Sequence, residues 1–159
     1  MLKTIFLYLF LHTLALAELK INSIIKLEEN IPNECGIGFL IENNNLFHKA
    51  AISIKKLEGE DTLTIFKIES SDILENADLI TSSSKISKLL DKKELKDKNL
   101  KYFGVTPQDS MTFFFQDLLI NGGELTINKT TYEIAGPIDS KVRLEYLFCT
   151  GEMFLPNYE

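Results

Sequence analysis

The clearest local signal in the sequence is TPQDSMTFFFQDLLINGG, from Thr106 to Gly123. Thr106 suits a helix N-cap, Pro107 suits the first helical position, and Gly122 with Gly123 provides a stop signal. Apolar residues between these signals recur at i, i+3, i+4, i+7 and i+8, which predicts one amphipathic helix that packs on a sheet. The residues of this apolar stripe are Met111, Phe114, Phe115, Leu118 and Leu119.

Two strand patterns follow this helix. Residues 124–128 and 131–134 alternate apolar and polar side chains about a turn at Asn128, which predicts a hairpin. Residues 141–149 alternate as well, so we expect a long strand that delivers Cys149 to an edge of the sheet. Asn128 also begins an Asn-Lys-Thr sequon, and a glycan on this turn would be accessible if the source organism glycosylates.

The region before the helix contains further predicted elements. Residues 46–56 alternate and residues 62–69 are rich in β-forming side chains, so the two should form a hairpin. Residues 18–33 suit either a short helix or an extended lead-in, and two short helices are expected at 72–79 and 82–93. This order predicts an α+β fold, an antiparallel β-sheet with two or three helices packed on one face.

Length and charge restrict the possible functions. The 159 residues, 45% of them hydrophobic, can bury one ordinary core. Lys and Arg number 17 against 23 for Asp and Glu, a net charge of −6, so a nucleic-acid partner is not expected. Two Cys and two His are too few for an ordinary structural zinc site, and we expect no metal or cofactor.

The N-terminus has the pattern of an export signal. Lys3 precedes an apolar run over residues 4–17 that ends in Ala-Leu-Ala, which predicts cleavage between Ala17 and Glu18. The run is shorter than the roughly 20 residues of a membrane-spanning helix, and no later segment is long and apolar enough to span. We therefore expect a signal peptide at 1–17 and one globular domain at 18–159, periplasmic or secreted, with no transmembrane segment after cleavage.

The two cysteines lie near the two ends of the predicted domain. In an oxidising compartment Cys35 and Cys149 are expected to form a disulfide, although two separate buried thiols remain the alternative. The closed loop would exceed 100 residues, for which the chain-entropy model gives about 4 to 5 kcal/mol of stabilisation.

Cys35 also allows an enzymatic hypothesis. The run Cys35-Gly-Ile-Gly-Phe39 resembles the start of the class II glutamine amidotransferase domain, in which the cysteine is the nucleophile. That family needs the cysteine as first residue of the mature chain, whereas cleavage here is expected at Ala17, and its later His-Thr-Arg and Asn-Gly segments are not found. The other route is a dyad in which His48 would lower the pKa of the Cys35 thiol.

A lysine-rich segment lies on an otherwise acidic chain. Residues 85–101 contain seven lysines and three acids, and we expect a basic, partly helical protrusion that could dock on an anionic partner or lipid surface. An ordinary solvated face is the alternative. The lysines of this possible interaction patch are Lys85, Lys88, Lys92, Lys93, Lys96, Lys98 and Lys101.

These observations favour a small exported, non-enzymatic domain that binds or supports another macromolecule in the periplasm or outside the cell. No glycine-serine elbow, phosphate loop or EF-hand loop is present, so we expect no catalytic residues. The alternatives are a hydrolase or amidotransferase-like enzyme using Cys35, and a carrier of an apolar small ligand. The carrier would line its pocket with Phe113, Phe114, Phe115 or Tyr146.

Overall fold

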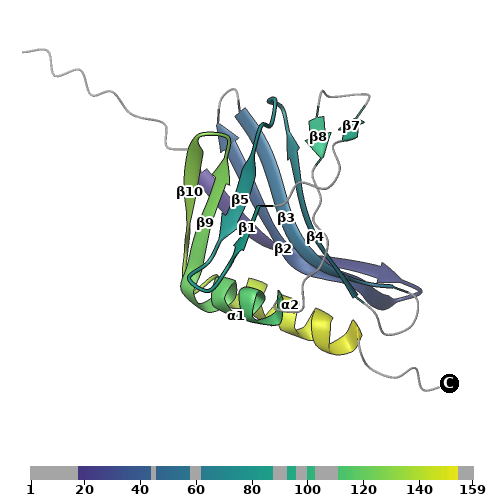
Figure 1. Ribbon diagram of the computed structural model, residues 1–159. Coiled ribbons are helices and arrows are strands. Elements are labelled where there is room, and N and C mark those ends of the chain that lie inside the picture. The colour runs from purple at the N-terminus through teal and green to yellow at the C-terminus, as the bar shows by residue number, and fades with distance from the viewer. Residues whose placement is uncertain are drawn as a thin grey trace, which may run out of the picture.

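The computed structural model describes residues 18–43, 46–57, 62–87, 93–95, 100–102 and 111–153 (Figure 1). The expected signal peptide at 1–17 and the expected helix cap Thr106 lie outside these ranges. The described residues form antiparallel sheets with two helices, an α+β arrangement in which strands predominate.

The first sheet is a meander in which each strand pairs with the next along the chain. Its register places alternate residues on one face, and on β2 that face consists of Cys35, Ile37, Phe39 and Ile41, all of them buried. The predicted hairpin of 46–56 with 62–69 is confirmed, while the lead-in at 18–33 proves to be extended. The strands are β1 (Glu18–Glu28), β2 (Ile31–Asn43), β3 (Leu46–Lys56) and β4 (Thr62–Ser70).

The second sheet has the strand order β10-β9-β5-β6 and is also antiparallel. The predicted hairpin around Asn128 is confirmed, and Leu125 lies opposite Tyr132 in its register. The strands are β5 (Ala77–Ile80), β6 (Lys85–Ile86), β9 (Gly122–Ile127) and β10 (Thr130–Ala135). A separate two-stranded sheet consists of β7 (Lys93–Leu95) and β8 (Leu100–Tyr102).

Both helices, α1 (Met111–Asn121) and α2 (Ser140–Met153), lie at one end of the two large sheets (Figure 1). The predicted stop of the first helix is confirmed. Gly122 has a φ of 77°, a left-handed conformation that favours glycine, and a Cβ there would collide with the Ile134 carbonyl oxygen. The chain can therefore turn directly from α1 into β9.

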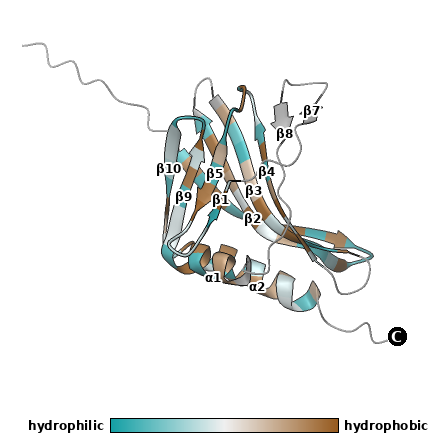
Figure 2. Cartoon of the chain, viewed as in Figure 1, coloured by the Kyte–Doolittle hydropathy of each residue, from teal (hydrophilic) through white to brown (hydrophobic). Residues whose placement is uncertain are grey.

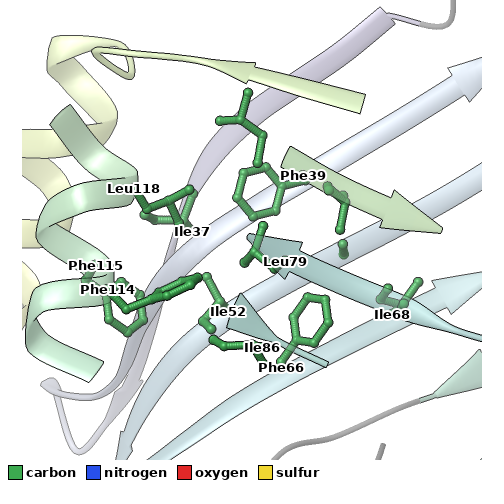
Figure 3. Packing of buried hydrophobic residues seen from close by; sticks show 14 of the residues in the cluster. Ile37, Phe39, Ile52, Phe66, Ile68, Leu79, Ile86, Phe114, Phe115 and Leu118 are labelled. Atoms are coloured by element: carbon green, nitrogen blue, oxygen red, sulfur yellow. The ribbon is translucent and has the colours of Figure 1, made fainter. Parts of the chain in front are cut away.

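One hydrophobic cluster joins the inner faces of both large sheets and the two helices. Phe114, Phe115 and Leu118 project from α1 toward side chains of the strands (Figure 3). Phe114, Phe115, Leu118 and Leu119 of the predicted apolar stripe therefore face the core, whereas the side chain of Met111 lies outside the described part of the structure. Strand residues in the cluster include Ile37, Phe39, Ile52, Phe66, Ile68, Leu79, Leu125 and Ile134.

The short helix predicted at 72–79 is wrong, and the one predicted at 82–93 is wrong over its described residues, 82–87 and Lys93; residues 88–92 lie outside the described ranges. The first segment contains β5, in which Ala77 and Leu79 alternate into the core and pair with β9, while the second contains β6 and begins β7. The serines at 82–84 lie in the turn between β5 and β6. A short apolar run is compatible with the two-residue period of a strand and with the 3.6-residue period of a helix. Pairing with β9 makes residues 77–80 a strand.

The strand expected at 141–149 is also wrong, because this segment lies within helix α2. Val142, Tyr146, Cys149 and Met153 are buried at i, i+4, i+7 and i+11, which is a helical spacing. Val142, Leu144, Tyr146 and Phe148 alternate with polar residues as they would on one face of a strand. However, Leu144 and Phe148 are exposed, so the four side chains do not share a buried face. In the described residues, the single expected sheet is therefore replaced by two four-stranded sheets, with α2 at their end, and the small β7–β8 sheet.

Candidate functional site

The structure pairs Cys35 and Cys149 in a disulfide, with Cα atoms 5.8 Å apart and 114 positions between them in sequence. The bond links β2 to α2 and is buried in a small cluster with Met153 and Ile54. Because a disulfide sulfur carries no thiolate, Cys35 has no nucleophile in this state.

His48 does not approach Cys35. In the register of β2 with β3, Cys35 lies opposite Ile54 and His48 lies opposite Ile41, so six residues, about 20 Å of strand, separate the two side chains. His48 is buried, and its Nδ1 lies 2.7 Å from the Ser70 hydroxyl. The structure therefore does not bring the expected dyad together.

The aromatic residues considered for a ligand pocket lie in two different environments. Phe114, Phe115 and Tyr146 are buried in the core, and the rings of Phe115 and Tyr146 stack. Burial raises the pKa of the Tyr146 hydroxyl. Phe113 lies on the other side of α1 with 71% of its surface exposed. Three of these side chains are therefore buried in the core, and the fourth, Phe113, faces solvent.

The lysine-rich segment is not helical where the structure describes it. Lys85 lies on β6 and forms an ion pair with Asp78 at 2.9 Å, so its charge is already used within the second sheet. Lys93 lies on β7 and Lys101 on β8, opposite Tyr102 and Glu94 respectively. Four of the predicted patch residues, Lys88, Lys92, Lys96 and Lys98, lie outside the described residues.

A charge cluster that the sequence did not reveal surrounds Glu34 on β2. Its carboxylate is nearly inaccessible and pairs with Lys26 of β1, while the Ser53 hydroxyl of β3 donates to it at 2.7 Å. Lys67 of β4 approaches the same carboxylate at 3.4 Å. One carboxylate thus connects all four strands of the first sheet.

The environment of Glu34 keeps it ionised. Burial opposes its charge, but the hydrogen bonds from Lys26 and Ser53 and the positive charge of Lys67 outweigh burial and lower the pKa of Glu34. Burial also lowers the pKa of Lys67, against the opposing attraction of Glu34. The cluster is internally satisfied, so it stabilises the sheet and offers no vacant catalytic group.

The Asn128 turn is likewise satisfied from within. Its side-chain oxygen accepts a hydrogen bond from the Glu75 amide at 2.8 Å, and its Nδ2 donates to the Ile73 carbonyl at 2.8 Å. Asn128 also adopts a positive φ of 54°. The nitrogen to which a glycan would attach therefore already joins the hairpin turn to the preceding loop.

An open hollow of about 610 Å³ lies where α1 passes into β9. Glu124 and Glu133, opposite each other in the β9–β10 register, line it together with the backbone of Gly122 and Gly136. Next to Ser82 and Asn121 of its lining, the half-buried Asp117 carboxylate accepts hydrogen bonds from the Asn121 side-chain amide, the Ser82 hydroxyl and the Ser83 backbone amide, which lower its pKa. Asp117 thereby ties α1 to the β5–β6 turn.

The outer faces of the two helices carry the most conspicuous surface feature of the described residues. Five large apolar side chains on these helices are each more than half exposed, and Figure 2 shows hydrophobic residues along both helices at this end of the molecule. Large exposed apolar patches mark interaction sites, whereas singly scattered apolar residues need no explanation, and three of these five side chains lie on one stripe of α2. The residues are Phe113 and Ile120 on α1 and Leu144, Leu147 and Phe148 on α2.

Helix α2 is apolar on two opposite faces. One face buries Val142 and Tyr146 against the core, whereas Leu144, Leu147 and Phe148 follow a second stripe on the solvent side. A surface helix normally carries one apolar stripe, which faces the core, and polar residues on the opposite face. The outer stripe of α2 therefore has the composition of a covered surface although it is exposed in the single chain.

Comparison with known proteins gives no match: no protein-family model, no curated protein and no solved structure corresponds to the chain. Within the described ranges no three His, Cys, Asp or Glu side chains gather as a metal site would require. Across the same ranges neither helix is long and apolar enough to cross a membrane.

Proposed function

We propose that this chain is an exported, non-enzymatic domain that binds a protein partner through its helical end. The observation that carries the proposal is the set of large apolar side chains exposed on the outer faces of α1 and α2. Protein interfaces are built around such apolar and aromatic anchors. The helical end is defined here as Phe113, Ile120, Leu144, Leu147 and Phe148.

Export to the periplasm or the cell exterior is supported by the N-terminal signal pattern and is compatible with the Cys35–Cys149 disulfide. Sequencing the N-terminus of the exported protein tests this part of the proposal. We expect it to start at Glu18; a chain that retains Met1 on membranes would overturn export.

The binding surface is tested by capturing partners with three versions of the exported protein. Leu147→Glu places a charge in the helical end, whereas Ile73→Glu removes a comparably exposed apolar side chain beside the Asn128 turn. A partner retained by wild type and Ile73→Glu but lost from Leu147→Glu supports the proposal. A partner set that is identical for all three proteins would contradict it.

A further inference from the structure

We propose that two copies of the chain associate by antiparallel pairing of their α2 helices. This inference rests on the proposed function, because it names the partner that covers the helical end. It starts from the outer stripe of α2, in which Leu144, Leu147, Phe148 and Gly151 recur at i, i+3, i+4 and i+7. This is the spacing of helix–helix contact residues.

The stripe is complementary to itself in the antiparallel direction. A two-fold axis between positions 147 and 148 places Leu147 of one copy opposite Phe148 of the other, and Leu144 opposite Gly151. Each pairing occurs twice, as an isologous interface requires. A large side chain then meets the smallest one at both ends of the contact.

No steric requirement for glycine at position 151 is found among the described residues. A Cβ added there would meet no other part of the described chain within 4 Å, and the residue is helical without a positive φ. Glycine inside a helix costs about 0.5 to 1 kcal/mol relative to alanine. Close packing of Leu144 from a second copy accounts for a glycine at this position.

Charge complementarity favours the same arrangement. Lys141 and Glu152 lie on the same flank of the apolar stripe, near opposite ends of α2, and both are exposed. Glu145 lies between them on this flank, where it contacts Lys141 of its own chain at 3.9 Å and accepts a hydrogen bond from Ser23 of β1, so its carboxylate is held against its own copy. In an antiparallel pair, residues of the same flank face each other, so Lys141 of one copy lies within about 3 Å, measured along the helix axis, of Glu152 of the other. The two helix dipoles also oppose, which is favourable.

The size of the contact predicts a weak dimer. A helix of 14 residues is about 21 Å long, so α2 alone covers less area than a standard stable interface. Phe113 and Ile120 on α1 extend the apolar surface at the same end of the molecule. We therefore expect a dissociation constant on the order of micromolar.

The test is sedimentation velocity of the exported protein from about 1 to 300 μM, a range that brackets micromolar dissociation constants. We expect a reversible dimer. Lys141→Glu and Glu152→Lys should each raise the dissociation constant at least about tenfold, because each creates two like-charge contacts. The double variant should return to within about threefold of wild type. Lys129→Glu makes the same charge change on the exposed β9–β10 turn and should have no effect.

A second variant keeps the test independent of charge. Gly151→Leu raises helix propensity, so the single chain should fold at least as well, but the larger side chain should block close approach and weaken the dimer. A monomer at every concentration, or a double charge variant that is not rescued, overturns the inference. A dimer that appears only after removal of residues 154–159 also overturns it, since the chain would then cover its own helix. In each of these cases, loss of another partner from Leu147→Glu would leave the proposed function standing.

Discussion

The rings of Phe115 and Tyr146 stack with centroids 5.0 Å apart and planes only 16° from parallel. This contact joins α1 to α2 inside the core, whereas Phe113, two residues earlier, faces solvent. The same helix thus contributes one phenylalanine to stability and presents another to solvent.

Phe115→Ala should destabilise the protein by about 3 to 5 kcal/mol, because it removes a buried ring and its stacking partner contact. Phe113→Ala is the matched control and should change stability by less than about 0.5 kcal/mol. Urea unfolding followed by circular dichroism measures both. Equal losses for the two variants would show that the core assignment of α1 is wrong.

Replacing Cys149 by Ser should lower the melting temperature, because the disulfide closes a loop of 114 positions and constrains the unfolded chain by about 4 to 5 kcal/mol. The variant should expose one titratable thiol, that of Cys35, in denaturant. The wild-type protein should titrate none until it is reduced. Two free thiols in unreduced wild type would contradict the pairing.

Glu34→Gln should cost about 2 to 3 kcal/mol at neutral pH, since Lys26 and Lys67 lose their shared carboxylate. The pKa of Glu34 is lowered in the folded state, so its stabilisation is present above the unfolded glutamate pKa and disappears as pH falls through the folded value. The difference between variant and wild type should therefore shrink toward acid pH.

Glu42→Gln provides the control for this measurement. Glu42 lies on the same strand but is exposed, with Lys20 at 4.0 Å, and its loss should cost less than about 0.5 kcal/mol. If the two variants were equally stable, the Glu34 cluster would contribute nothing beyond a surface ion pair.

Titration of His48 should give the stability of the protein a second dependence on pH. Burial lowers the pKa of His48, against the charge of Asp72, so the unfolded chain binds a proton below about pH 6.5 that the folded chain resists. The free energy of unfolding should decrease as the pH is lowered from 7.5 to 5.5, and His48→Gln should make this decrease smaller. Ser70→Ala removes the hydrogen bond but keeps the titrating group, so its slope should remain. A slope unchanged by His48→Gln would assign it to another group.

Local signals predicted some elements well because their physical cause is local. The apolar stripe of α1 ends at a glycine whose left-handed conformation stops the helix, and the alternation at 46–56 reproduces β3 together with its buried face. The cysteine pair was predicted from compartment chemistry, without knowledge of the elements that carry it. The Glu34 cluster had no such signal, because its members come from four separate strands.

The amino-acid sequence alone predicted the helix α1 and the β3–β4 and β9–β10 hairpins, because each depends on neighbouring residues. It favoured a Cys35–Cys149 disulfide over two separate thiols, and the structure shows the pairing. Tertiary structure alone decided that 77–80 is a strand and 140–153 a helix. Segment 140–153 contains an alternating pattern and a helical pattern together. Packing of Tyr146 and Cys149 against the rest of the fold selects the helix, and that choice turns Leu144, Leu147 and Phe148 outward as the candidate interaction surface.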